Sequence, residues 1–131
     1  MRAQIVAIAG FATVVTSAPL GAHHSISGHY HRNESGTIAG FVIDVVLRNP
    51  HSQIHMGVNN ASGSAEMWTL EMDDVADMAK QGIVSGTIRA GDEIVVVGNP
   101  ARDGSNALFI RTLHRPADEF EYEEDWPLSA E

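Results

Sequence analysis

The stretch TIAGFVIDVVL (residues 37–47), followed by RNPH (48–51) and SQIHMGV (52–58), decides the fold of this 131-residue chain. Its first part is rich in β-branched residues and is ended by Asn49-Pro50, which predicts a long strand with a bend or bulge at Gly40. Its last part alternates apolar and polar residues, which predicts a second strand with one buried face. Two strands joined by a short loop are therefore the starting point of the fold.

Further elements follow toward the C-terminus. Asp73-Asp74 is a helix-capping pair and Gly82 a natural terminator, so a short helix is expected between them. The other segments are apolar runs bounded by Gly, Asn and Pro, which predicts strands. The expected elements are strands over 66–71, 93–98 and 107–114 and a helix over 75–81.

The order of these elements predicts a mainly β fold, a small five-stranded OB-like Greek-key barrel with one short helix between strands 3 and 4. A β-sandwich is the alternative. Phe41 and Trp68 are expected to fill the core. Barrels of this type bind ligands with the loops between strands 1 and 2 and strands 4 and 5, which are residues 49–51 and 99–105 here.

The first 22 residues differ from the rest of the chain. A basic start at Arg2, an uncharged apolar run over 5–15 and a small-residue exit are the three parts of a secretory signal, and the run is too short to span a membrane. We expect cleavage after Ala22, with Ala18 as a competing position. The protein is therefore expected to be periplasmic or secreted, with no membrane span in its mature form.

Cleavage after Ala22 divides the chain into four parts. The mature protein would have 109 of the 131 residues, which suits a single domain. The expected parts are a signal peptide (1–22), a His-rich N-terminal arm in extended or irregular conformation (23–35), the barrel (36–116) and an acidic C-terminal tail (117–131) that is mobile or loosely docked.

Charge and composition exclude several classes of function. Removal of Arg2 would leave seven basic against 17 acidic residues, a formal charge of −10, so nucleic acid is not an expected partner. The chain has no cysteine, so a metal would need nitrogen or oxygen ligands. A phosphate-binding loop, a nucleophile elbow and a His-Glu-x-x-His zinc helix are all missing, so a hydrolase is not indicated.

Seven histidines are the main candidates for chemistry, and four of them lie within nine positions: His23, His24, His29 and His31. Imidazole suits copper, zinc and nickel, although a solvated polar leader is the ordinary interpretation. Cleavage after Ala22 would make His23 the terminal residue, so that its α-amine and ring could chelate one metal, an arrangement often called a histidine brace. Copper(II) favours such planar nitrogen sets, and His24 offers a competing chelate through an amide nitrogen.

His51 is the candidate third ligand, although Asn-Pro-His is also ordinary turn chemistry. His55 shares its strand face but lies roughly 13 Å away along an extended chain, so no site role is expected for it. His29 and His31 would share a face if extended, and His114 is expected to be structural. Glu71 is a metal or hydrogen-bond partner or, more commonly, a solvated carboxylate. Arg102 and Asp103 lie in a loop of ordinary turn chemistry, in which Asp103 and Gly104 serve the backbone, and their place at the expected binding rim keeps both as candidates for binding.

Several segments together resemble a family of small exported bacterial proteins that is classified as a domain of unknown function. The resemblance implies an exported barrel-like domain and favours His23, His24 and His51 over the other histidines. The chain departs from the family by lacking aromatic residues before Asn-Pro-His and by adding His29, His31 and the acidic tail. The matching segments are Ala22-His23-His24-Ser25, Asn49-Pro50-His51-Ser52, Trp68-Thr69-Leu70-Glu71, 91–98 and 100–105.

Two alternative functions are therefore expected. The first is a periplasmic protein that binds a transition metal, copper before others, through His23, His24 and His51. The second is a metal-free OB-like module that recognises a small envelope ligand or a protein through the two named loops. A copper oxidoreductase would need an open coordination position and a substrate surface that the sequence does not identify, so a binding protein is expected before an enzyme.

Overall fold

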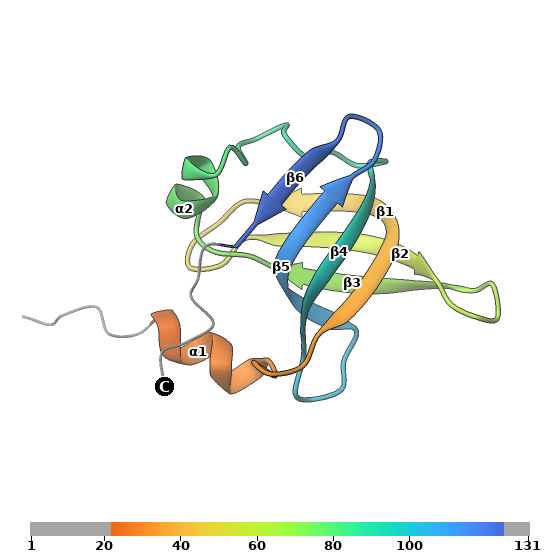
Figure 1. Cartoon of the computed structure of the whole chain (residues 1–131), viewed down its shortest axis with the longest axis horizontal. Helices are drawn as coiled ribbons and strands as arrows, with labels where there is room; N and C mark the ends of the chain where they lie inside the picture. The colour runs from red at the N-terminus through yellow and green to blue at the C-terminus, as the bar shows by residue number, and fades with distance from the viewer. Residues whose placement is uncertain (1–21, 125–131) are drawn as a thin grey trace, which may run out of the picture.

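The structure, a computed structural model of the chain, describes residues 22–124, and for residues 22–25 only the backbone is described. The expected signal peptide therefore lies outside the described residues except for Ala22. In chain order the elements are α1 (Ala22–His29), β1 (Gly36–Val46), β2 (Gln53–Asn59), β3 (Ala65–Glu71), α2 (Val75–Lys80), β4 (Glu93–Pro100), β5 (Ala107–Arg115) and β6 (Phe120–Glu123) (Figure 1).

Strands β1 to β5 close into a barrel. Hydrogen bonding runs in the order β3-β2-β1-β4-β5, and β3 and β5 pair in parallel to complete the ring. With α2 between β3 and β4, this is the OB-like Greek-key barrel predicted from the element order. The five predicted strands and the helix are confirmed, with boundaries that differ by at most two residues.

Strand β1 belongs to both halves of the barrel because it bends along its length. Its first half pairs with β4 and its second half with β2, and Phe41 takes part in both ladders. The bulge is at Ile43, where the register shifts between Val42 and Asp44, and not at Gly40 as predicted. Gly40 is instead a point of close approach, since a Cβ there would lie 2.1 Å from the carbonyl oxygen of Gly57.

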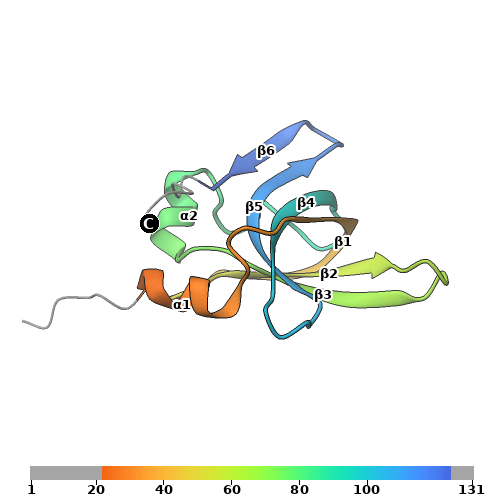
Figure 2. The ribbon, with the colours of Figure 1, turned by 60° about the horizontal axis from the view of Figure 1, so that its bottom comes forward.

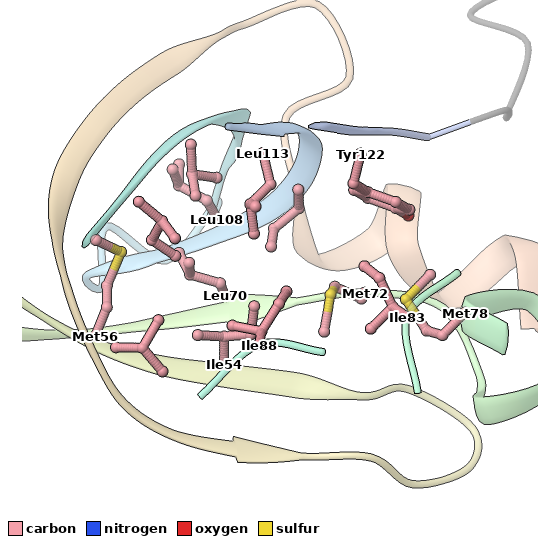
Figure 3. Packing of buried hydrophobic residues seen from close by; sticks show 14 residues of the cluster. Ile54, Met56, Leu70, Met72, Met78, Ile83, Ile88, Leu108, Leu113 and Tyr122 are labelled. Carbon is pink, nitrogen blue, oxygen red and sulfur yellow. The ribbon is translucent and has the colours of Figure 1, made fainter. Parts of the chain in front are cut away.

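The core lies inside the barrel and continues under α2 (Figure 3). Ile54 and Met56 are fully buried, as the alternation in β2 predicts, and Trp68 is partly buried against the same cluster. The prediction for Phe41 is wrong, because Val42 takes the inward position and leaves the Phe41 side chain 55% exposed. The cluster consists of Val42, Ile54, Met56, Leu70, Met72, Met78, Ile83, Ile88, Ile94, Val96, Leu108, Ile110, Leu113 and Tyr122.

Helix α1 replaces most of the extended arm expected over 23–35. It lies against the outside of the barrel (Figures 1 and 2), where Ile26 and Tyr30 pack on Phe109 of β5 in a second buried cluster. The chain then bridges to the β4–β5 loop through the pairing of Tyr30 with Ala101. Ile26 and Tyr30 are sufficient to dock this polar segment, because the barrel supplies the other half of the apolar contact. Neither helix within residues 22–124 is long and apolar enough to cross a membrane.

The start of the expected acidic tail also forms structure. Strand β6 pairs with the end of β5, and Tyr122 is buried against the core. Its hydroxyl donates a 2.6 Å hydrogen bond to the carboxylate of Glu124, which is itself buried. The prediction of a mobile or loosely docked tail is therefore wrong for residues 120–124, and residues 125–131 lie outside the described part of the chain.

Candidate functional site

A pocket of about 720 Å³ lies where α1 meets the β1–β2 and β4–β5 loops. These are the two loops that the predicted fold marks as a binding surface, and the structure brings them together around one space. The pocket is lined by Gly28, His29, Tyr30, Pro50, His51, Glu71, Ala101, Arg102, Asp103, Ser105 and Ala107.

His51 is held at the pocket by the backbone next to it. The Ser52 amide donates to the Asp73 carbonyl at 3.0 Å, and the Met72 amide donates to the Ser52 carbonyl at 2.9 Å. On the other side, the Asn49 side-chain oxygen accepts a hydrogen bond from the first amide of α2 at 3.1 Å. The loop that carries His51 is therefore fixed to the connection between β3 and α2, and the His51 side chain is only 15% exposed.

Glu71 lies between His51 and α1. Its Oε2 accepts a 2.7 Å hydrogen bond from the Tyr30 hydroxyl, and its Oε1 lies 3.7 Å from Nδ1 of His51. Burial, then the hydrogen bond to Glu71, raise the pKa of Tyr30 above its ordinary value. Glu71 is 21% exposed, so the prediction of a solvated carboxylate is wrong and the hydrogen-bond partner weighed beside it is what the structure has.

Arg102 fastens α1 to the barrel. Its Nε donates to the carbonyl of Ser27 at 3.0 Å and to that of Tyr30 at 3.2 Å, and its amide donates to the carbonyl of His29 at 2.8 Å. These carbonyls lie at the C-terminal end of α1, where backbone acceptors have no partner within the helix. A cation also interacts favourably with that end of a helix. The role of Arg102 is therefore different from the turn chemistry predicted for it.

Asp103 serves the turn as predicted. Its Oδ1 accepts from the Ser105 amide at 2.9 Å, and Gly104 has a φ of 77°, which glycine adopts readily. The hydrogen bonds from Ser105 hold the pKa of the Asp103 carboxyl below its ordinary value. Asp103 therefore lines the pocket with a carboxylate that already accepts a hydrogen bond from the backbone.

The remaining histidines are distributed over separate places. His29 lines the pocket, whereas His31 lies beyond the helix with Nδ1 3.3 Å from Glu34, so the two do not share one extended face. His55 lies outside the residues that line the pocket, with Nδ1 2.6 Å from Oδ1 of Asp44. His114 lies on β5 with its Nδ1 3.8 Å from Glu121.

His23 and His24 lie in the first turn of α1, and their side chains are outside the described residues. In both ribbon views the first turn of α1 is on the side of the barrel where the β1–β2 loop lies (Figures 1 and 2). Among the side chains that the structure describes, no three His, Asp or Glu residues form a group that could hold a metal ion. The pocket lining contains His29, His51, Glu71 and Asp103, and of these His51 and Glu71 lie 3.7 Å apart.

Comparison with known proteins gives a family without an assigned activity. The model of DUF6152, a family of unknown function, matches residues 12–109, about three quarters of the chain. The chain belongs to this family. The matched range includes α1, His51, Glu71 and Arg102, and it ends before β6. This membership agrees with the resemblance noted from the sequence.

The barrel is also similar to a solved structure. A mitochondrial single-stranded DNA binding protein from S. cerevisiae, Rim1, aligns with a TM-score of 0.50 and 9% sequence identity, over 63% of this chain and 93% of that chain. At this identity the similarity shows the fold alone. No curated protein matches the sequence.

Sequence reasoning did not find Tyr30, and it did not predict that Arg102 would hold α1. Tyr30 is the one aromatic residue in the polar segment 23–35, which is a weak signal, and its partner Glu71 is 41 positions away. Arg102 contacts carbonyls more than 70 positions earlier in the chain. Such long-range partners have no local signature in a single sequence.

Proposed function

We propose that the protein is exported and binds a transition metal, copper(II) before others, through His23, His24 and His51. One observation carries the proposal: His51 lines the same pocket as Gly28 and His29, the last residues of α1, and the first turn of this short helix contains the two terminal histidines. A role in the periplasm or outside the cell is proposed from the signal-like sequence of residues 1–22.

The start of α1 suits a terminal chelate. The first backbone nitrogens of a helix have no acceptor inside the helix, so the α-amine of a processed His23 could bind a metal without breaking a helical hydrogen bond. With the His23 ring and a ring nitrogen of His51, it would supply three of the nitrogens that copper(II) favours in a tetragonal set. In such a set, His24 is a competing ligand for the same ion.

The surroundings of the pocket also support a bound cation. Glu71 brings a carboxylate within 3.7 Å of the His51 ring, in a place that is mostly shielded from solvent. A negative charge in such a place offsets part of the cost of moving a cation out of water. Arg102 and Tyr30 hold α1 against the barrel, so the terminal histidines are attached to an ordered element.

The proposal is tested by titrating copper(II) into the processed protein that begins at His23 and into the same protein with its α-amine acetylated. Acetylation removes the free amine as a ligand and is expected to weaken affinity by more than about 100-fold, beyond the 10–100-fold typical of outer-shell changes. His51→Ala is expected to weaken it at least about tenfold, and His55→Ala should leave it unchanged. Equal affinity of the first two proteins would refute the terminal chelate, and equal affinity of His51→Ala would remove His51 from the site.

A second candidate is a small-molecule site in the same pocket. Its volume of about 720 Å³ lies within the roughly 300–1,000 Å³ of small-molecule sites, and its walls combine Pro50, Ala101 and Ala107 with polar groups. This function predicts a ligand whose affinity is insensitive to acetylation of the α-amine. Binding of a small envelope molecule in a metal-free buffer, measured by calorimetry, would favour it over the metal.

Single-stranded DNA, which the yeast protein of similar fold binds according to its name, is a weaker candidate. The formal charge of −9 opposes the phosphate backbone, which is the dominant source of affinity in nucleic-acid binding. Fluorescence anisotropy with a labelled oligonucleotide at low salt checks this, and no binding is expected.

A further inference from the structure

The two oxygens of Glu71 have different neighbours, one from each side of the pocket. Oε2 is bonded to the Tyr30 hydroxyl at 2.7 Å, and Oε1 faces the His51 ring with 3.7 Å to Nδ1. A hydrogen bond between nitrogen and oxygen is ~2.9 Å long, so an approach of roughly 0.8 Å would turn this contact into one. Glu71 therefore links the residue that follows α1 to the loop that carries His51.

Glu71 is also held by its own backbone. It is the last residue of β3 and is paired with Gln53 of β2 on one side and with Phe109 of β5 on the other. Tyr30, which holds the carboxylate, packs its ring on that same Phe109 with the ring centres 5.9 Å apart. A carboxylate fixed in this way, and only 21% exposed, acts on a neighbouring ring more strongly than one in open water.

We infer that Glu71 is a positioning residue of the proposed metal site, which orients the His51 ring from its Nδ1 side and presents Nε2 to the metal. The inference rests on the proposed function. Histidines that bind metals commonly donate their other ring N–H to a carboxylate, which fixes the tautomer and makes the ligand nitrogen more basic. Tyr30 serves the same end one step further out, because its hydroxyl fixes the carboxylate.

The chain contains its own control for this arrangement. His55 and Asp44 form a second histidine–carboxylate pair with a shorter distance of 2.6 Å between Nδ1 and Oδ1. Asp44 is 57% exposed, and His55 lies outside the pocket lining. If proximity of a carboxylate were sufficient, this pair would behave like His51 and Glu71.

The first test is copper(II) titration of the processed protein with Glu71→Gln, Tyr30→Phe and Asp44→Asn variants, with electron paramagnetic resonance of each complex. Glu71→Gln should weaken affinity by roughly 10–100-fold and change the copper hyperfine coupling, Tyr30→Phe should do so by a smaller factor, and Asp44→Asn should do neither. If Glu71→Gln matched the parent while His51→Ala did not, the role of Glu71 would be overturned and the metal site would stand.

The second test is made without metal, so it does not depend on copper binding. Nitrogen-15 NMR at about pH 8.5, where an ordinary imidazole is neutral, reports which ring nitrogen of His51 carries the proton. The parent should carry it on Nδ1, and Glu71→Gln should shift the population toward Nε2, with His55 unchanged as the internal reference. A His51 proton on Nε2 in the parent would overturn the positioning role whatever the copper titration gave.

Discussion

The outer face of β1, β2 and β3 has one covered end and one bare end, although the same strands build both. Cross-strand partners point to the same side, so Glu93, Phe41, Gly57 and Met67 form one row and Val46, Gln53, Glu71 and Phe109 another. Helix α1 and Tyr30 cover the second row at Glu71 and Phe109, and Phe109 is fully buried there. The first row is bare, with Phe41 55% and Met67 63% exposed.

Each end has an aromatic side chain and a histidine–carboxylate pair nearby, so composition does not distinguish them. What differs is the cover that α1 provides. It buries the aromatic ring at one end, and its neighbour Tyr30 holds the carboxylate there. The comparison teaches that a local sequence pattern acquires a role only through what packs on it.

The largest expected difference between the two ends concerns their aromatic residues. Phe109→Ala removes a fully buried ring from the contact with α1 and should lower the free energy of unfolding by about 3–5 kcal/mol. Phe41→Thr keeps a β-former in the strand and should change it by no more than about 0.5 kcal/mol. Urea denaturation measures both, and equal losses would show that the bare end is buried in solution.

A second contrast concerns two glycines at the bare end. A Cβ at position 40 would lie 2.1 Å from a backbone oxygen, so Gly40→Ala should cost about 2–3 kcal/mol of stability. A Cβ at position 57 meets nothing closer than 3.8 Å, so Gly57→Ala should be neutral or stabilising by up to about 1 kcal/mol. The same denaturation experiment decides it, and a harmless Gly40→Ala would contradict the close approach of β1 and β2.

Asp73, two residues after Glu71, is a carboxyl group through which the stability of the fold depends on pH. Burial, then the nearby Glu124, raise the pKa of Asp73 from its ordinary 3.8 to about 7. The folded state therefore binds a proton that the unfolded chain has released, and this contribution to stability is lost as the pH rises from about 4 through about 7. Melting temperatures from pH 4 to 8 should fall less steeply for Asp73→Asn than for the parent. Parallel curves would contradict the raised pKa.

The smallest expected effects concern the two histidine–carboxylate pairs. Tyr30→Phe removes a hydrogen bond to a mostly buried carboxylate and should cost about 1.5 kcal/mol of stability. Asp44→Asn changes a pair on the surface and should cost less than about 0.5 kcal/mol. If the order of these two were reversed in a denaturant titration, the covered end would not be the more strongly held one.

The barrel could be predicted from the sequence because its strands carry local signals. The Asn49-Pro50 stop, the alternation in β2 and the capping of α2 by Asp74 each act within a few residues, and each is confirmed by the structure. The errors within the barrel come from the bulge at Ile43 and from Phe41. Which face of β1 is inside depends on partners in β2 and β4.

Less of the candidate site could be predicted. The two loops follow from the fold type, and His51 follows from its place in one of them. Helix α1 and β6 could not be predicted, because each is held by one or two apolar side chains, such as Ile26 and Tyr122, on a surface built elsewhere in the chain. For the same reason the hydrogen bond from Tyr30 to Glu71 emerges only in three dimensions.

The docking of α1 has a consequence for the entropy of assembling any site at its first turn. His23 and His51 are 28 positions apart, and a freely moving leader would have to be localised anew at every binding event. The contacts made by Arg102 restrict that search while the protein folds, which raises the effective concentration of the chain end at the pocket. Preorganisation of this kind is established before any ligand arrives, so an occupied site should in return protect the amides of α1 from hydrogen exchange.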